Sequence, residues 1–173
     1  MRVASAGLYF PAMRRTSYEQ MNCSIASALD VVGEPWTLLI VRDAFYGVRR
    51  FDDFQSALGI GRNILSLRLN RLVDEGILSR VEYQQSPSRH EYRLTDKGRE
   101  LWPVLTAMRE WGDRWAAPGG APLEVVHEAC GEVTHPTFVC SECGEPIDRR
   151  SARVRPGPGA HSGDFDRTAL ATT

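Results

Sequence analysis

The chain has 173 residues, of which 42% are hydrophobic and 25% are charged, and its formal net charge is −1. This composition is ordinary for a soluble globular protein. It argues against a disordered chain, which would combine low hydrophobicity with a high net charge. The sequence has neither an apolar run of the roughly 20 residues that span a bilayer nor a secretory signal. We therefore expect a cytoplasmic protein that does not act at a membrane.

The net charge averages two parts of opposite sign. Residues 1–120 carry 16 basic and 14 acidic groups, a balance of +2, whereas residues 121–173 carry 5 basic and 8 acidic groups, a balance of −3. All basic residues except Lys97 are arginines, which suit bidentate contacts with phosphate and guanine. The overall value of −1 therefore does not argue against a nucleic-acid partner.

Two apolar helices are predicted first. Hydrophobic residues recur at helical spacing from Ser24 to Val32, and Gly33 ends that segment. Pro35 suits a first helical position, and a second, strongly apolar helix follows it to about Gly47.

A short helix, a tight turn and a longer amphipathic helix come next. Asp52 is predicted to be the N-cap of the short helix, with Gln55 completing a capping box. The longer helix runs from Arg62 to Glu75, and Gly76 supplies a left-handed stop.

After Gly76 the hydrophobic residues no longer recur at helical spacing but alternate with polar ones, a period of two residues. This predicts strands at Leu78–Gln84 and His90–Leu94. Thr95 and Asp96 cap a last long helix, in which Pro103 should produce a kink or shift the start. The order predicts a mainly α fold with a small β-hairpin wing, a winged helix-turn-helix.

The longer helix has an apolar face and an opposite polar face that suits DNA. Asparagine pairs bidentately with adenine and arginine with guanine in the major groove, and arginines near the short helix and the wing suit phosphates. The alternative is that these are solvated side chains on a helical scaffold. The predicted DNA contacts are Arg49, Arg50, Arg62, Asn63, Ser66, Arg68, Asn70, Arg71, Arg89 and His90.

Residues 23–115 resemble HxlR-type winged helix-turn-helix transcriptional regulators, which are relatives of the MarR class. The resemblance rests on Cys23-Ser-Ile-Ala-Ser-Ala-Leu-Asp, Pro35-Trp-Thr-Leu-Leu-Ile-Val-Arg-Asp, Arg49-Arg-Phe-Asp-Asp-Phe, the helix from Arg62 and Glu91-Tyr-Arg-Leu-Thr-Asp-Lys-Gly. It implies a homodimer that binds near-palindromic operators in double-stranded DNA, and no enzyme activity. Many members begin the recognition helix with a Ser-Pro-Arg-like sequence, which this chain lacks, so the operator sequence does not carry over.

An apolar stripe on the last helix has no later helix to cover it. Because dimers of the resembling family pack their terminal helices together, we expect this stripe to form the dimer interface; packing on the first helix of the same chain is the alternative. Two-fold symmetry would place two recognition helices about one DNA turn apart. The stripe consists of Leu101, Leu105, Met108, Trp111 and Trp115.

A Cys/His pattern follows the domain. Four soft or borderline ligands on two turns suit one structural, tetrahedral zinc ion in a zinc-ribbon-like appendage, which would also stabilise so short a segment. His135 is an alternative fourth ligand, and a metal-free segment with reduced cysteines is the alternative to zinc. The predicted ligands are His127, Cys130, Cys140 and Cys143.

Cys23 lies just ahead of the first helix, where a helix N-terminus favours the reactive thiolate. Some HxlR-type regulators use a cysteine at this place as a redox switch, so Cys23 is a redox-switch candidate and the effector is a small molecule or an oxidant. The alternative is a buried, inert thiol.

Two other functions compete with DNA binding. A winged helix that has lost DNA binding would act as a protein-interaction module, against which the polar helix face argues. A thiol oxidoreductase would use Cys140 and Cys143, but it needs a strand–helix–strand setting that this Gly/Pro-rich segment lacks.

The predicted organisation has five segments. They are a disordered N-terminal arm (1–20), the winged helix-turn-helix and dimerisation domain (21–117), a linker (118–122), the Cys/His segment (123–155) and a flexible tail (156–173).

Overall fold

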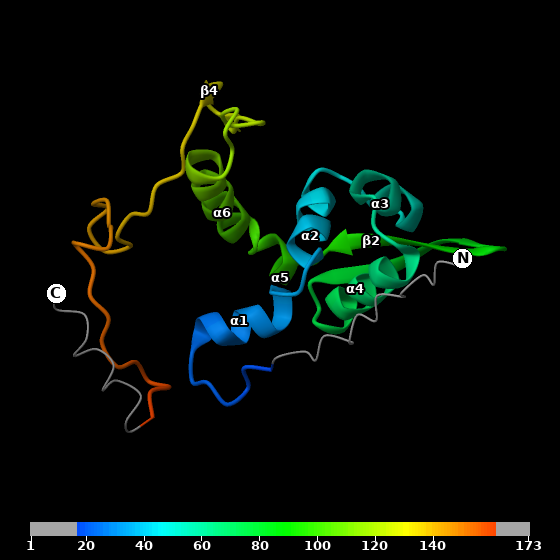
Figure 1. Cartoon of the computed structure of the whole chain (residues 1–173), viewed down its shortest axis with the longest axis horizontal. Coiled ribbons are helices and arrows are strands. Elements are labelled where there is room, and N and C mark those ends of the chain that lie inside the picture. Colours follow the sequence, from blue (N-terminus) through cyan, green and yellow to red (C-terminus); the bar gives the residue numbers. More distant parts are fainter. Residues whose placement is uncertain (1–16, 162–173) are drawn as a thin grey trace, which may run out of the picture.

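The computed structural model describes residues 17–161, so most of the predicted arm and the end of the predicted tail lie outside the described residues. Figure 1 shows α2, α3, α4 and a β-hairpin gathered together, with α1 and α6 extending away from them. The elements are α1 (Ser24–Val32), α2 (Thr37–Phe45), α3 (Phe51–Leu58), α4 (Arg62–Asp74), β1 (Leu78–Gln85), β2 (Ser88–Leu94), α5 (Asp96–Arg99), α6 (Trp102–Trp115), β3 (Val126–His127) and β4 (Glu132–Val133).

The hydrophobic core sits between α2, α3, α4 and the base of the hairpin. Leu65, Leu69 and Leu72 share one face of α4 at helical spacing and are fully buried, together with Phe54 of α3 and Ile40 of α2. Burying each such side chain contributes about 1.5–3 kcal/mol. This core fixes α3 and α4 relative to each other, as a helix-turn-helix requires.

The hairpin forms the wing. β1 and β2 pair antiparallel from Leu78 opposite Leu94, with an irregularity between Glu82 and Gln84. The segment before α3 joins the sheet, because Arg50 forms a bridge with Glu91. The wing is therefore anchored to the start of the helix-turn-helix.

The first two predicted helices are present, but two details of the helix starts differ. Pro35 lies ahead of α2, because Trp36 takes a left-handed conformation (φ 76°) as its N-cap. The predicted capping box of α3 is wrong: Arg50 is the N-cap, and Asp52 lies inside the first turn without a capping hydrogen bond. Asp52 instead forms an ion pair with Arg62 at 3.2 Å.

The single long helix predicted after the wing is two helices. Thr95 caps α5 by accepting a hydrogen bond from the Gly98 backbone N–H at 3.1 Å. Pro103 falls in the first turn of α6, where its missing N–H has no helical partner to lose. The proline therefore shifts the start of α6.

α1 and α6 leave apolar side chains uncovered. α1 buries only Ala26 and Val32, and α6 buries only Thr106. Ile25 of α1 is 72% exposed. Within residues 17–161 no single helix is long and apolar enough to cross a bilayer; α1 and α2 pass that test only together, with a bend of 78° between them.

The segment after α6 lies against that helix and returns toward α1. The His135 ring hydrogen-bonds the Glu110 carboxylate of α6 at 3.0 Å, and this contact holds the pKa of that carboxyl below its usual range. Farther along, the Asn22 side-chain amide donates to the Gly159 carbonyl at 2.8 Å. The chain after α6 therefore contacts α6 through His135 and the residues just before α1 through Gly159.

Candidate nucleic-acid interface

The outward face of α4 consists of exposed polar side chains. Asn63, Ser66 and Asn70 are exposed, and no hydrogen bond involves their side chains among residues 17–161. Leu65 and Leu69, on the opposite face, hold the helix in the core. The donors and acceptors of this face are therefore free for the edges of bases.

The start of α4 is joined to α3 through Arg62. Its guanidinium donates to Asp52 at 3.2 Å and to Gln55 at 3.1 Å, and it lies 4.8 Å from the centre of the Phe51 ring. Two-thirds of the Arg62 side chain is nevertheless exposed. Arg62 thus braces the helix-turn-helix and still faces solvent.

Two predicted DNA contacts on α4 are engaged inside the chain. Arg68 is only 14% exposed; it pairs with Glu34 at 2.6 Å and donates to the Pro35 carbonyl at 3.1 Å. Arg71 pairs with Glu75, one turn along, at 2.7 Å. Arg68 thereby holds α4 to the connection between α1 and α2.

The wing and Arg50, the N-cap of α3 that pairs with β2, carry further predicted contacts. Arg50 lies 4.8 Å from the centre of the Tyr83 ring, and His90 is 3.1 Å from the Arg80 guanidinium. Arg89 is exposed, and none of its side-chain atoms has a bonding partner among the described residues. The Arg93 hydrogen bond at 3.0 Å holds the pKa of Glu91 below its usual range.

Arg49 shares a recess with two arginines that were not among the predicted DNA contacts. Arg93 and Arg99 line the same recess of about 310 Å³, beside Tyr92. The Tyr92 N–H donates to the Arg49 carbonyl at 2.8 Å, which fixes Arg49 against β2. Only the fold brings these residues, 50 positions apart at their extremes, to one place.

The predicted dimer stripe divides into two parts. Leu101 and Leu105 pack against the hydrophobic core, whereas Met108, Trp111 and Trp115 are 54%, 64% and 70% exposed. The predicted interface did not include three further exposed apolar residues, Trp102 of α6 and Ile25 and Leu29 of α1.

The Cys/His segment forms two separate turns. His127 Nδ1 lies 3.3 Å from Cys130 Sγ, and the backbone N–H groups of Cys143 and Glu142 hydrogen-bond the Cys140 sulfur, which lowers the pKa of that thiol. A glycine with positive φ, Gly131 or Gly144, follows each turn.

Within residues 17–161 no three His, Cys, Asp or Glu side chains are arranged to hold a metal, so the predicted four-ligand site is not assembled. His135, the alternative ligand, contacts Glu110 instead.

Cys23 is the N-cap of α1, and its thiol is exposed rather than buried. The Cys23 carbonyl accepts hydrogen bonds from the Ser27 N–H at 3.0 Å and from the Ser27 hydroxyl at 3.2 Å.

Known proteins share this architecture. The model of the HxlR-like helix-turn-helix family matches residues 31–119. The uncharacterised HTH-type transcriptional regulator Rv3095 of Mycobacterium tuberculosis is 47% identical over 137 residues, which cover 79% of this chain and 87% of the relative. The similarity to this relative therefore extends beyond the residues that the family model matches.

Two solved structures, each described as a candidate transcription factor, are similar. PA1607 has a TM-score of 0.72 and 41% identity, covering 82% of this chain and all of its own. PA1374 of Pseudomonas aeruginosa has a TM-score of 0.60 and 38% identity, covering 84% of this chain and 99% of its own. The mainly helical fold with a hairpin wing is thus confirmed. The chain belongs to the HxlR-like helix-turn-helix family and is a DNA-binding transcriptional regulator, not an enzyme.

Proposed function

We propose that the protein acts in the cytoplasm as a homodimer on near-palindromic operator DNA, with α4 in the major groove and the wing on the backbone or minor groove. The free polar face of α4, made by Asn63, Ser66 and Asn70, carries this proposal. These side chains match the hydrogen-bonding edges of bases. Arg49, Arg50, Arg62, Arg89 and His90 flank them as phosphate contacts.

The exposed apolar surface of α1 and α6 supports the homodimer. Met108, Trp111 and Trp115 on α6, with Ile25 and Leu29 on α1, place large hydrophobic side chains in water. Patches of this kind mark interaction surfaces in soluble proteins. A second copy would cover them and pair two α4 helices for two half-sites.

A shift assay on the protein's own promoter region tests the function. We expect binding to that DNA to be far tighter than to a scrambled duplex of equal length, and to weaken steeply as salt rises, because phosphate contacts release counterions. Equal affinity for both duplexes would contradict sequence-specific binding and favour the protein-interaction alternative.

We also propose that zinc joins the two turns of the Cys/His segment. Each turn already places two ligands together, His127 with Cys130 and Cys140 with Cys143. Zinc ligated by three cysteines and one histidine is a closed structural site, whose binding free energy would stabilise a segment with little core. Metal analysis of purified protein should give one zinc per chain, lost in Cys140→Ser. Well-folded wild-type protein with substoichiometric zinc would contradict the site.

Cys23 is our proposed redox switch. Its thiol is exposed at the start of α1, beside the proposed dimer surface, so oxidation there would act on the dimer. Peroxide or quinone should release DNA from the wild type but not from Cys23→Ser. Unchanged release in Cys23→Ser would refute the switch.

A further inference from the structure

The connection between α1 and α2, residues 33–36, turns the chain sharply. A bend of 78° separates the two helices, and Figure 1 shows α1 leading away from the gathered helices. Within the connection Trp36 has φ 76°, a left-handed conformation that a residue other than glycine keeps only where its surroundings hold it. The angle between α1 and the helix-turn-helix therefore depends on what fixes this connection.

Arg68 of α4 holds this connection at two adjacent points. Its guanidinium pairs with the Glu34 carboxylate at 2.6 Å, and its Nε donates to the Pro35 carbonyl at 3.1 Å. The Arg68 side chain is 14% exposed and that of Glu34 is 30% exposed, so solvent ions screen the pair weakly. Because a guanidinium is a rigid planar fork, contacts with two successive residues fix the direction of the connection as well as its distance from α4.

The far end of α1 follows the angle that is set at this connection. α1 has nine residues and buries only Ala26 and Val32, of which Val32 is its last residue. Ile25, near its start, is 72% exposed. At about 1.5 Å per residue the helix is about 13 Å long, so a tilt of about 10° at its base moves Ile25 by about 2 Å relative to α4.

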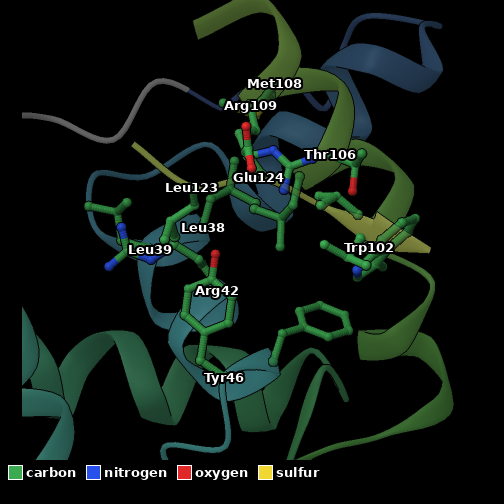
Figure 2. A pocket seen from close by; sticks show the side chains of 14 residues that line it. Leu38, Leu39, Arg42, Tyr46, Trp102, Thr106, Met108, Arg109, Leu123 and Glu124 are labelled. Atoms are coloured by element: carbon green, nitrogen blue, oxygen red, sulfur yellow. The ribbon is translucent and has the colours of Figure 1, made fainter. Parts of the chain in front are cut away.

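α6, the other helix of the proposed dimer surface, is not packed closely on α2. A cavity of about 580 Å³ lies between the two helices. Figure 2 shows Leu38 and Tyr46 of α2 and Trp102 and Met108 of α6 around it. Contacts that determine one geometry are packed without voids of this size. α6 therefore fixes the dimer surface less firmly than a close helix contact would, and the contacts of Arg68 matter correspondingly more.

We propose that Arg68 is a positioning residue that sets the distance between the two α4 helices of the dimer, and with it the number of base pairs that the protein accepts between half-sites. This inference rests on the proposed function, because it needs the homodimer on a near-palindromic operator. Ile25 and Leu29 place α1 in the proposed dimer surface. Two-fold symmetry doubles a displacement of about 2 Å to about 4 Å, close to the rise of about 3.4 Å per base pair.

Shift assays on operators of different spacing test the proposal. The half-sites of the promoter operator, located by footprinting, are separated by the native spacer or by one base pair fewer or more. The wild type should bind the native spacer at least about tenfold more tightly than either neighbour, because a rigid dimer cannot reach both shifted half-sites. Glu34→Gln, which breaks the ion pair of Arg68, should bind all three within about threefold, and the native spacer more weakly than the wild type does, because a loose connection loses preorganisation.

Two further variants separate geometry from charge. Arg68→Lys keeps the cation on α4, but an ammonium group lacks the planar fork that holds Glu34 and Pro35 together, so it should also flatten the spacer profile. Glu75→Gln is the matched control: it breaks the ion pair of Arg71, which joins α4 only to its own C-cap. Glu75→Gln should keep the preference of the wild type for the native spacer.

A preference for the native spacer that persists in Glu34→Gln and Arg68→Lys, or an equal flattening in Glu75→Gln, would overturn the proposal. Thermal unfolding of each variant confirms that it folds, and a general loss of stability would lower affinity by the same factor on every spacer. Failure of the proposed function looks different and would overturn both: the wild type would sediment as a monomer or bind the operator and a scrambled duplex alike.

Discussion

At the scale of single residues, α4 separates side chains that are free from side chains that are already engaged. Asn70 and Asn63 face solvent without bonding partners among residues 17–161, whereas Arg68 is held by Glu34 and Arg71 by Glu75. An engaged arginine must break an ion pair before it can contact DNA. Base reading therefore falls to the asparagines more than to Arg68.

Asn70→Ala should weaken operator binding by about 1–3 kcal/mol, the usual worth of a good bidentate base contact. The loss should be confined to one base pair: on an operator changed at that position, wild type and variant should bind alike. Titrated shift assays on both operators measure this. An equal loss on every sequence would show that Asn70 contacts the backbone instead.

Gly98 is a residue whose missing side chain matters for stability. It is buried, and a Cβ atom there would collide with the Ile77 backbone carbonyl. Gly98→Ala should destabilise the fold by about 1–3 kcal/mol, the usual cost of overpacking. Urea unfolding measures the difference. Gly119→Ala, where a Cβ meets open space, is the matched control and should stay within about 0.5 kcal/mol of the wild type.

At the scale of elements, the sequence predicted α4 and the hairpin best. The leucines of α4 set a clear period, and Gly76, with φ 68°, ends it as expected. The prediction that Asp52 caps α3 was wrong because several short polar residues can cap a helix locally. The start of α3 is fixed instead by the pairing of Arg50 with Glu91, which lies far along the chain. Pro103 allowed either a kink or a new start, and the structure has the new start: Thr95 caps a separate short helix, α5, and Pro103 lies in the first turn of α6.

The candidate DNA interface, too, could be predicted from the sequence only where a local pattern determines it. The exposed side chains of α4 follow from its helical period alone. Partners such as Glu34 for Arg68, or Arg93 and Arg99 beside Arg49, come from other elements, and no local pattern specifies them. The zinc pattern predicted ligands by spacing, yet spacing does not determine whether two turns meet without the metal.

The wing should respond to acid through Glu91. Because Arg93 lowers the pKa of Glu91 below its ordinary value of 4.5, the folded state favours the carboxylate. The resulting stabilisation is present above pH 4.5 and is lost as the pH falls through the lowered pKa. Urea unfolding above and below pH 4.5 should therefore show a shallower loss of stability in Glu91→Gln than in the wild type. Identical slopes would contradict a role for this carboxylate.

At the scale of the whole molecule, α1 and α6 extend from a well-packed winged helix (Figure 1). The chain after α6 contacts α6 through His135 and Asn22, just before α1, through Gly159. The contact of His135 with Glu110 occupies one face of α6, while Trp111 and Trp115 stay exposed. The appendage thus contacts α6 at Glu110 and leaves exposed the two tryptophans of the surface that we propose for the second copy.

Trp111→Glu should convert the proposed dimer into monomers, because a carboxylate buried in an apolar interface loses its hydration without a partner. Sedimentation velocity measures the change, and operator affinity should fall with it. Val154→Glu, which alters a 79% exposed residue outside α1 and α6, should remain dimeric. A Trp111→Glu variant that stays dimeric would place the interface elsewhere.

The proposed dimer would also make the local dynamics of α1 depend on protein concentration. A helix of nine residues that buries only Ala26 and Val32 is shorter than the roughly 12–15 residues at which isolated helices become marginally stable in water. Its backbone amides should therefore exchange with solvent deuterium quickly in dilute protein and slowly once a partner covers Ile25 and Leu29. Amides of α4, held by the core of a single chain, should exchange at the same rate at both concentrations.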